Sequence, residues 1–283
     1  MTPLFLRKAA GLLPPPLRRA ASGAMLDLQS LPARLADPDR RRDPWQVIHN
    51  VGGGDYALAG RENLTLLIEQ AGLDRHSRVL DIGCGTGRMA APLVAWLNEG
   101  AGYVGFDISE SAISTCRRTL GAARPDFRFI HADIRNREYR SNGSISETTF
   151  VFPVEDASID VAFATSVFSH MTLESITHYL AETRRILKPG GRFMFTAYAL
   201  TQERIVAIQQ GQGHLAFKPW EDDAMVIDFT SPERAIAHPL SSLIDAIRQS
   251  GLELPADVRF GAWLPPTQYG GGQDLFTARK PAL

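Results

Sequence analysis

The sequence predicts an α/β fold: a doubly wound sheet of seven strands, mostly parallel, with an antiparallel last strand and helices on both faces. Two observations support this prediction. From residue 60 onward, short apolar runs alternate with segments of helical periodicity, which is typical of βαβ units and a parallel sheet. Right-handed crossovers between parallel strands then place helices on both faces. The composition, 44% hydrophobic and 22% charged over 283 residues, excludes a disordered or collagen-like chain.

Seven apolar runs have the length of strands. The predicted strands are residues 78–82, 103–107, 127–130, 159–164, 192–198, 258–263 and 274–278. The last two are joined by residues 264–273, a loop rich in proline and glycine that is short enough for a hairpin-like return. This connection predicts the antiparallel end of the sheet.

Segments of helical periodicity separate the strands. The predicted helices are residues 60–73, residues 89–97, a helix capped by Ser109, residues 173–187 and residues 242–251. Pro189-Gly190-Gly191 follows the fourth of these helices and is expected to end it.

The chain divides into a basic N-terminal arm, residues 1–50, and a single domain, residues 51–283. The arm holds eight Arg and Lys residues against four Asp residues, whereas the net charge of the whole chain is −1. We favour a solvated extension that packs loosely on the domain; contact of residues 1–42 with a membrane surface or an acidic partner is the alternative. Because the chain is nearly neutral overall, nucleic acid is not favoured as a partner.

Two insertions interrupt the alternation, at residues 135–154 and 199–240. The first follows the third predicted strand and the second follows the fifth. Both therefore leave near the C-terminal edge of the sheet, where ligands of open α/β sheets bind. We expect both to form the substrate-side wall of a site.

Cysteine usage and hydropathy restrict the class of protein further. Cys84 and Cys116 are too few for a disulfide framework or a Cys-rich zinc site, and no Cys/His spacing indicates a metal. A reducing compartment and a cytoplasmic location are expected. No apolar run approaches the roughly 18 residues that cross a bilayer.

A glycine-rich turn, Gly83-Cys-Gly85-Thr-Gly87, joins the first predicted strand to the next helix. Such a turn lets the backbone approach a ligand closely. The dinucleotide fingerprint has a further glycine where this chain has Arg88, and no Gly-Lys-Ser/Thr of a phosphate loop follows. Asp81, just ahead of the turn, would repel a pyrophosphate but attract an ammonium group.

Carboxylates also follow the next two strands. Asp107 ends the second strand, where it can accept hydrogen bonds from both hydroxyls of a ribose. Asp133 follows the third strand and can accept from the amine of a purine, while Ile134 packs on the ring. Together with Asp81, these residues predict a ligand that has an ammonium group, a ribose and an adenine, but no phosphate.

The motifs resemble those of the class I S-adenosylmethionine-dependent methyltransferases, which have a Rossmann-like fold. The resemblance covers about residues 60–200 and rests on five motifs in order: Asp81-Ile-Gly83-Cys-Gly85-Thr-Gly87, Asp107, Ala132-Asp133-Ile134, residues 160–171 and Leu187-Lys-Pro-Gly-Gly191. More loosely, the chain is similar to a bacterial subgroup with Gly52-Gly-Gly-Asp-Tyr56, Ser166-Val-Phe-Ser-His170-Met171, Gly261-Ala-Trp263 and Gln273-Asp274. That subgroup is associated with methylation of small molecules or cell-surface sugars.

The resemblance implies S-adenosylmethionine as the cofactor and a role for each matching residue. Asp81 would hold the methionine portion together with the turn residues Gly83, Cys84, Gly85 and Gly87. Asp107 would bind the ribose hydroxyls, and Asp133 with Ile134 would bind the adenine. Ile108 and Thr165 are further cofactor-binding candidates.

His170 is the candidate catalytic residue. It follows the fourth strand at the edge where an acceptor is expected, and its ordinary pKa of about 6.5 suits a general base that removes a proton from a hydroxyl. Alternatively, His170 caps the helix that starts near Thr172 or packs beneath the cofactor. His238, in the second insertion, is a weaker candidate to face the substrate.

The sequence therefore predicts methyl transfer to a small molecule, to a hydroxyl of a sugar or a secondary metabolite. Three other functions stay open at this point: a non-catalytic S-adenosylmethionine-binding module that regulates a partner, an RNA or protein methyltransferase, and an NAD-type oxidoreductase. Arg88 in place of a glycine, together with Asp81, argues against the last.

Overall fold

A computed structural model describes residues 15–36, 44–45 and 55–282 of the chain. Within these residues the central sheet has nine strands in the order β3-β2-β1-β4-β5-β8-β7-β6, with β9 paired to β5. The strands are β1 Val79–Ile82, β2 Tyr103–Asp107, β3 Phe127–His131, β4 Ile159–Ala164, β5 Leu187–Leu200, β6 Lys218–Pro219, β7 Met225–Val226, β8 Ile236–Pro239 and β9 Asp274–Arg279. The predicted α/β class is confirmed, but three of these strands, β6, β7 and β8, were not predicted.

The direction of winding reverses between β1 and β4. β1 pairs in parallel with β2, and β2 with β3, on one side; β4 and β5 continue in parallel on the other. β9 then runs antiparallel along β5, as predicted. In doubly wound sheets the crevice for ligands lies at such a reversal, beyond the C-terminal ends of the strands.

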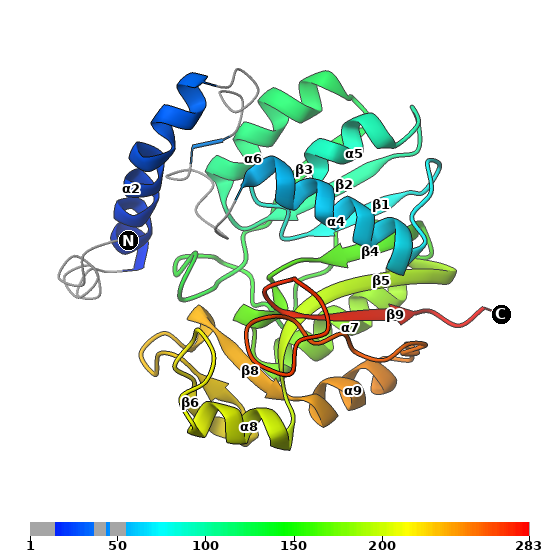
Figure 1. Ribbon diagram of the computed structural model, residues 1–283. Helices are drawn as coiled ribbons and strands as arrows, with labels where there is room; N and C mark the ends of the chain where they lie inside the picture. The colour runs from blue at the N-terminus through cyan, green and yellow to red at the C-terminus, as the bar shows by residue number, and fades with distance from the viewer. Residues whose placement is uncertain (1–14, 37–43, 46–54, 283) are drawn as a thin grey trace.

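Helices cover both faces of the sheet (Figure 1). The helices α4 Tyr56–Ala71, α5 Ala90–Trp96 and α6 Glu110–Cys116 share one hydrophobic core with Val79 and Tyr103. The helices α7 Leu173–Ile186 and α9 Leu240–Gln249 share the other with Leu80 and Phe106. The two cores have this composition because successive strand residues point to opposite faces.

Residues 15–36 of the predicted arm form one helix, α2 Pro15–Ala36, seen beside the domain in Figure 1. Residues 1–14, 37–43 and 46–54, including Gly52-Gly-Gly54, lie outside the described residues. No helix of the described part is both long and apolar enough to cross a bilayer.

Two boundaries differ from expectation near Pro189. The helix α7 ends at Ile186, and β5 begins at Leu187. Pro189, Gly190 and Gly191 therefore belong to the strand segment instead of ending the helix. Leu187 already pairs with Ile159 of β4, and this pairing competes with a further helical turn.

The predicted strand at residues 258–263 is wrong. This segment makes only an isolated bridge between Arg259 and Leu275. After Arg259 the chain bends around the side chain of Asp274. The Gly261 amide and the Trp263 indole nitrogen each donate a hydrogen bond of 2.9 Å to that carboxylate. The Asp274 carboxylate thus accepts the hydrogen bond of the Gly261 amide, which the backbone of a neighbouring strand would otherwise accept.

The second insertion contributes to the sheet instead of lying outside it. It contains the helix α8 Gln202–Gln209 and the strands β6, β7 and β8. β8 pairs in parallel with the end of β5 through Tyr198–Leu200. Its own small core includes Leu200, Phe217 and Met225 and extends to Trp263 and Leu264.

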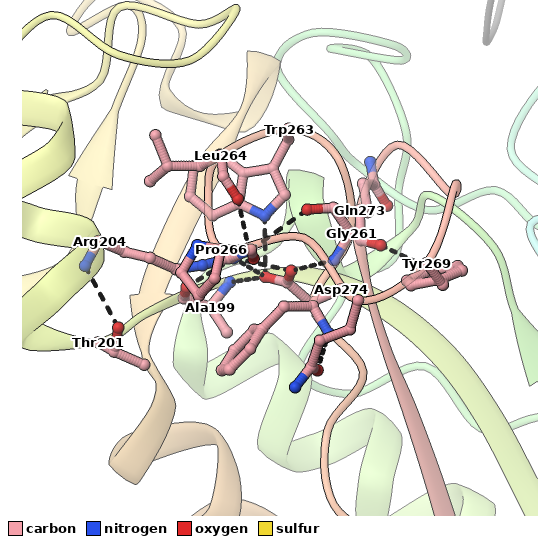
Figure 2. Close-up of polar contacts among 12 residues, drawn as sticks. Ala199, Thr201, Arg204, Gly261, Trp263, Leu264, Pro266, Tyr269, Gln273 and Asp274 are labelled. Atoms are coloured by element: carbon pink, nitrogen blue, oxygen red, sulfur yellow. Dashed lines mark hydrogen bonds and ion pairs between the residues drawn. The ribbon is translucent and has the colours of Figure 1, made fainter.

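A buried ion pair joins α8 to β9 (Figure 2). Arg204 and Asp274 are both 0% exposed and are bonded at 2.7 and 2.8 Å. Arg204 also donates to the carbonyl oxygens of Gly261, Leu264 and Pro266, at 3.3, 2.8 and 3.1 Å. Because most polar atoms of the pair are satisfied in this way, the pair connects the C-terminal loop, the second insertion and the sheet.

Arg204→Met should cost about 3–5 kcal/mol of unfolding free energy, because it leaves the Asp274 charge buried without its cation. Urea denaturation measures this loss. The matched control is Glu253→Gln, which breaks the exposed pair with Arg279 and should cost less than about 1 kcal/mol. A loss for Arg204→Met no larger than that of the control would contradict this account.

Candidate active site

One cavity of about 870 Å³ lies at the C-terminal edge of the sheet, beside the reversal between β1 and β4. Its volume is within the range of small-molecule and cofactor sites, about 300–1,000 Å³. Residues at or shortly after the ends of β1, β2, β3 and β4 line it. Among the predicted site residues these are Gly83, Gly85, Asp107, Ile108, Ile134, Thr165 and His170.

The three glycine positions of the turn between β1 and α5 all have positive φ, and two of them leave no room for a side chain. Gly83 and Gly87 have φ of 74° and 82°, and a Cβ on either would lie 2.5 Å from a side-chain carbon of Val167 or Leu120. Gly85, with φ of 52°, has nothing within 4 Å of its Cβ direction and lines the cavity. Its backbone is therefore open to close approach by a ligand.

Asp107 is held between two backbone amides. Its oxygens accept from the amide of Gly85 at 2.8 Å and from that of Ser109 at 2.7 Å. Burial raises the pKa of Asp107, and these hydrogen bonds oppose the rise. The carboxylate is thus rigidly oriented at the cavity wall.

Asp81 lies within β1 and faces Tyr103 of β2. It is 2% exposed and does not line the cavity; instead it accepts a hydrogen bond of 2.6 Å from the Tyr103 hydroxyl. Burial raises the pKa of Asp81 to about 7, and the nearby charge of Asp107 adds to the rise. Cys84 and Gly87 also lie outside the cavity lining.

Asp133 is engaged by the first insertion. Arg140 Nε donates to it at 2.8 Å and Ser144 Oγ at 2.5 Å, and these contacts lower the pKa of Asp133. Its side chain is not part of the cavity lining, whereas the adjacent Ile134 is. Asp133 thus holds the turn at residues 140–144 in place.

His170 ends a short 3₁₀ turn, Phe168–His170, that follows β4. Its Nδ1 atom is 2.8 Å from the carbonyl oxygen of Glu233, and its Nε2 atom is 3.4 Å from the Tyr139 hydroxyl. Since a carbonyl only accepts, the partners assign the proton to Nδ1 and leave Nε2 as an acceptor. Burial lowers the pKa of His170, so the imidazole is neutral at pH 7.

The alternative of His170 as a helix cap is excluded. The N-cap of α7 is Thr172, whose side chain accepts from the amide of Ser175. His238 is buried in β8, its Nε2 atom is 2.9 Å from the Met171 carbonyl oxygen, and it does not line the cavity.

The first insertion lines the cavity, whereas the second contributes no lining residue and only supports the wall from behind, so the expectation is met for the first insertion alone. Tyr139, Asn136, Glu138 and Glu147 of the first insertion line the cavity. The second insertion contributes the Glu233 carbonyl behind His170 and the Ser231 hydroxyl, which donates to Glu138 at 2.8 Å. The position of the insertions was the available signal; the irregular backbone of residues 135–147 carries no periodicity that would indicate which side chains point inward.

Metal ligation has no candidate group in the part of the chain described. No three His, Cys, Asp or Glu residues there are placed to hold a metal ion.

Comparison with known proteins agrees with this geometry. Residues 79–191 match the family model described as a methyltransferase domain. The chain is 27% identical to the eEF1A lysine and N-terminal methyltransferase of Mus musculus over 169 residues, 59% of this chain. It is 25% identical to the ubiquinone biosynthesis O-methyltransferase of Maricaulis maris over 211 residues, 72% of each chain. It spans only 22% of the length of the mouse protein.

The fold is also similar to that of solved structures. The PH0226 protein of Pyrococcus horikoshii OT3 superposes with a TM-score of 0.54 at 18% identity, covering 87% of this chain and 99% of that one. The matching domain contains the glycine turn, Asp107, Asp133 and His170, all at the edge of the sheet where the cavity lies. Residues 79–191 are thus a methyltransferase domain, and the family match together with the shared fold supports a class I S-adenosylmethionine-dependent methyltransferase.

Proposed function

We propose that the protein transfers the methyl group of S-adenosylmethionine to a hydroxyl oxygen of a small molecule, such as a sugar or a secondary metabolite. The observation that carries the proposal is the neutral imidazole of His170 at the cavity, with Nε2 free of a proton. A hydroxyl acceptor gains from such a base, whereas an amine needs only to arrive unprotonated. The Maricaulis maris relative, an O-methyltransferase by name, supports the same acceptor atom.

The residues around the cavity fit the cofactor. Asp107 would bind the ribose hydroxyls, because its carboxylate lies at the wall beside the open backbone of Gly85. The turn at Gly83 and Gly85 would hold the methionine portion, with the Asp107 carboxylate beside it; Asp81 lies outside the cavity lining and would act only from behind the turn. Ile108 and Ile134 would pack on the adenine. Asp133 is left out of this assignment because Arg140 and Ser144 occupy its carboxylate.

When bound, S-adenosylmethionine supplies an electrophilic methyl group, and the protein mainly aligns the acceptor with it. In the proposed reaction, His170 takes the hydroxyl proton at Nε2. The Glu233 carbonyl holds the opposite Nδ1–H and so fixes the required tautomer. The charge of Glu138 acts to raise the pKa of His170, which stabilises the imidazolium that forms.

The proposal is tested by incubating the full chain and tritiated S-adenosylmethionine with a bacterial extract, and then separating small molecules, RNA and protein. We expect label in the small-molecule fraction, in a linkage stable to mild base, as an ether is. Label confined to protein or RNA would refute a small-molecule acceptor, and methyl groups released by base as methanol would show an ester of a carboxyl group in place of an ether of a hydroxyl. The mouse relative's name makes a protein amine the alternative to watch for.

Asp107→Ala should weaken S-adenosylhomocysteine binding more than roughly tenfold, the loss expected from removing a charged hydrogen-bond partner. Titration calorimetry measures the affinity. Asp245→Ala, the same change at an exposed residue of α9, should leave it unchanged. Equal affinities for the two variants would remove Asp107 from the cofactor site.

His170→Ala should lower the rate of label transfer by roughly 10²–10⁴-fold if His170 is the base, with cofactor affinity within about threefold. Since the pKa of His170 is lowered, the rate should fall as pH drops through a value below 6.5, and this acid limb should vanish in the variant. Exposed His214→Ala is the control. A rate or acid limb shared by His170→Ala and the control would exclude His170 as the base.

A further inference from the structure

The turn that follows β4 contains a residue in a strained conformation. Ser166 has φ of 60°, in the left-handed region that side chains other than glycine rarely adopt. Thr165, Ser166 and Val167 line the cavity, and the 3₁₀ turn that ends in His170 comes directly after them. Such strain persists only where surrounding groups hold it.

The side chain of Gln273 supplies that restraint. Its Nε2 atom donates to Ser166 Oγ and to Ser169 Oγ, at 3.0 Å each. Its Oε1 atom accepts from Thr196 Oγ1 of β5 at 2.7 Å. The same Thr196 oxygen accepts from the Ser166 amide at 2.8 Å, which closes a ring of hydrogen bonds around the turn.

Gln273 is itself anchored from three sides. It precedes Asp274, the carboxylate of the buried ion pair, as Figure 2 shows. The Tyr269 hydroxyl donates to its carbonyl oxygen. Gly261 lies so close to that carbonyl that a Cβ on Gly261 could not be accommodated. The backbone of Gln273 therefore has little freedom, and its amide is presented to the β4 turn in one orientation.

We infer that Gln273 is a positioning residue: its amide fixes the strained turn at Ser166 and thereby places His170 at the cavity. The two motifs Gly261-Ala-Trp263 and Gln273-Asp274 then serve one structural purpose. The ion pair anchors the loop, and the loop delivers one amide to the active site. The significance of His170 rests on the proposed function, whereas the restraint of the turn does not.

The test follows the imidazole itself and needs no acceptor. Histidines are labelled with ¹⁵N in the full-length protein, and the His170 signals are assigned by their loss in His170→Gln. In Gln273→Ala the turn should relax and His170 should become more hydrated, so that its pKa rises toward the ordinary value by roughly 0.5 unit or more. S-adenosylhomocysteine affinity, which depends mainly on residues after β1 and β2, should stay within about threefold.

Two further variants separate positioning from general damage to the fold. Gln268→Ala removes an amide of the same loop, one that accepts only from the Phe260 backbone among its described bonds, and should leave the His170 titration unchanged. Gln273→Glu keeps the length and the acceptor for Thr196 but lacks the two donors at neutral pH, and should behave like Gln273→Ala.

Ser166→Gly tests the strain directly, because glycine adopts a positive φ without cost. In that background, Gln273→Ala should shift the His170 titration less than it does in the wild type. The inference is overturned if the Gln273→Ala titration superimposes on that of the wild type, if Gln268→Ala shifts it equally, or if the Ser166 and Gln273 effects are fully additive. If His170 is not the base, label transfer will be unchanged in His170→Ala. That result would contradict the proposed function but would not alter the His170 titrations in the Gln273 variants.

Discussion

Arg204 and Asp274 are charged side chains that are completely removed from water, and several parts of the molecule depend on their pairing. The pair binds the helix of the second insertion to the last strand, and its remaining hydrogen bonds shape the C-terminal loop. Burying two charges is tolerated only when nearly every polar atom is satisfied. The loop therefore has few alternative conformations, and it presents Gln273 to the turn after β4 in a fixed orientation.

The site combines two kinds of element with different rigidity. The half proposed to bind the cofactor is built on the ends of parallel strands, where glycines have positive φ and two backbone amides donate to Asp107. The half that carries His170 is built from irregular segments, which reach the cavity from residues far apart in the chain. A hydrogen bond that the Glu233 carbonyl accepts and those that Gln273 donates orient these segments in place of regular secondary structure. Methyl transfer needs little more from the protein than this alignment.

Most of the sheet was predictable because its strands are buried on both faces and so are short, continuous apolar runs. The strands at residues 103–107 and 159–164 have the bounds that were expected. The segment at 258–263 misled because its aromatic residues suit a strand, whereas its Gly261 amide and its Trp263 indole donate to the Asp274 carboxylate. The short strands β6 and β7 were missed because two residues each give no periodicity.

The sequence by itself determined the parallel α/β core, the glycine turn, Asp107 and the position of His170 after the fourth strand, because each of these depends on local pattern and on the order of elements. Only the tertiary structure decided which carboxylates face the cavity. In the folded chain Asp81 accepts a hydrogen bond from Tyr103, and Asp133 accepts one from Arg140. The tertiary structure also joined Gln273 to Ser166, a contact between residues more than a hundred positions apart. Such contacts depend on side-chain direction and on charge pairing across the fold, which no local pattern encodes.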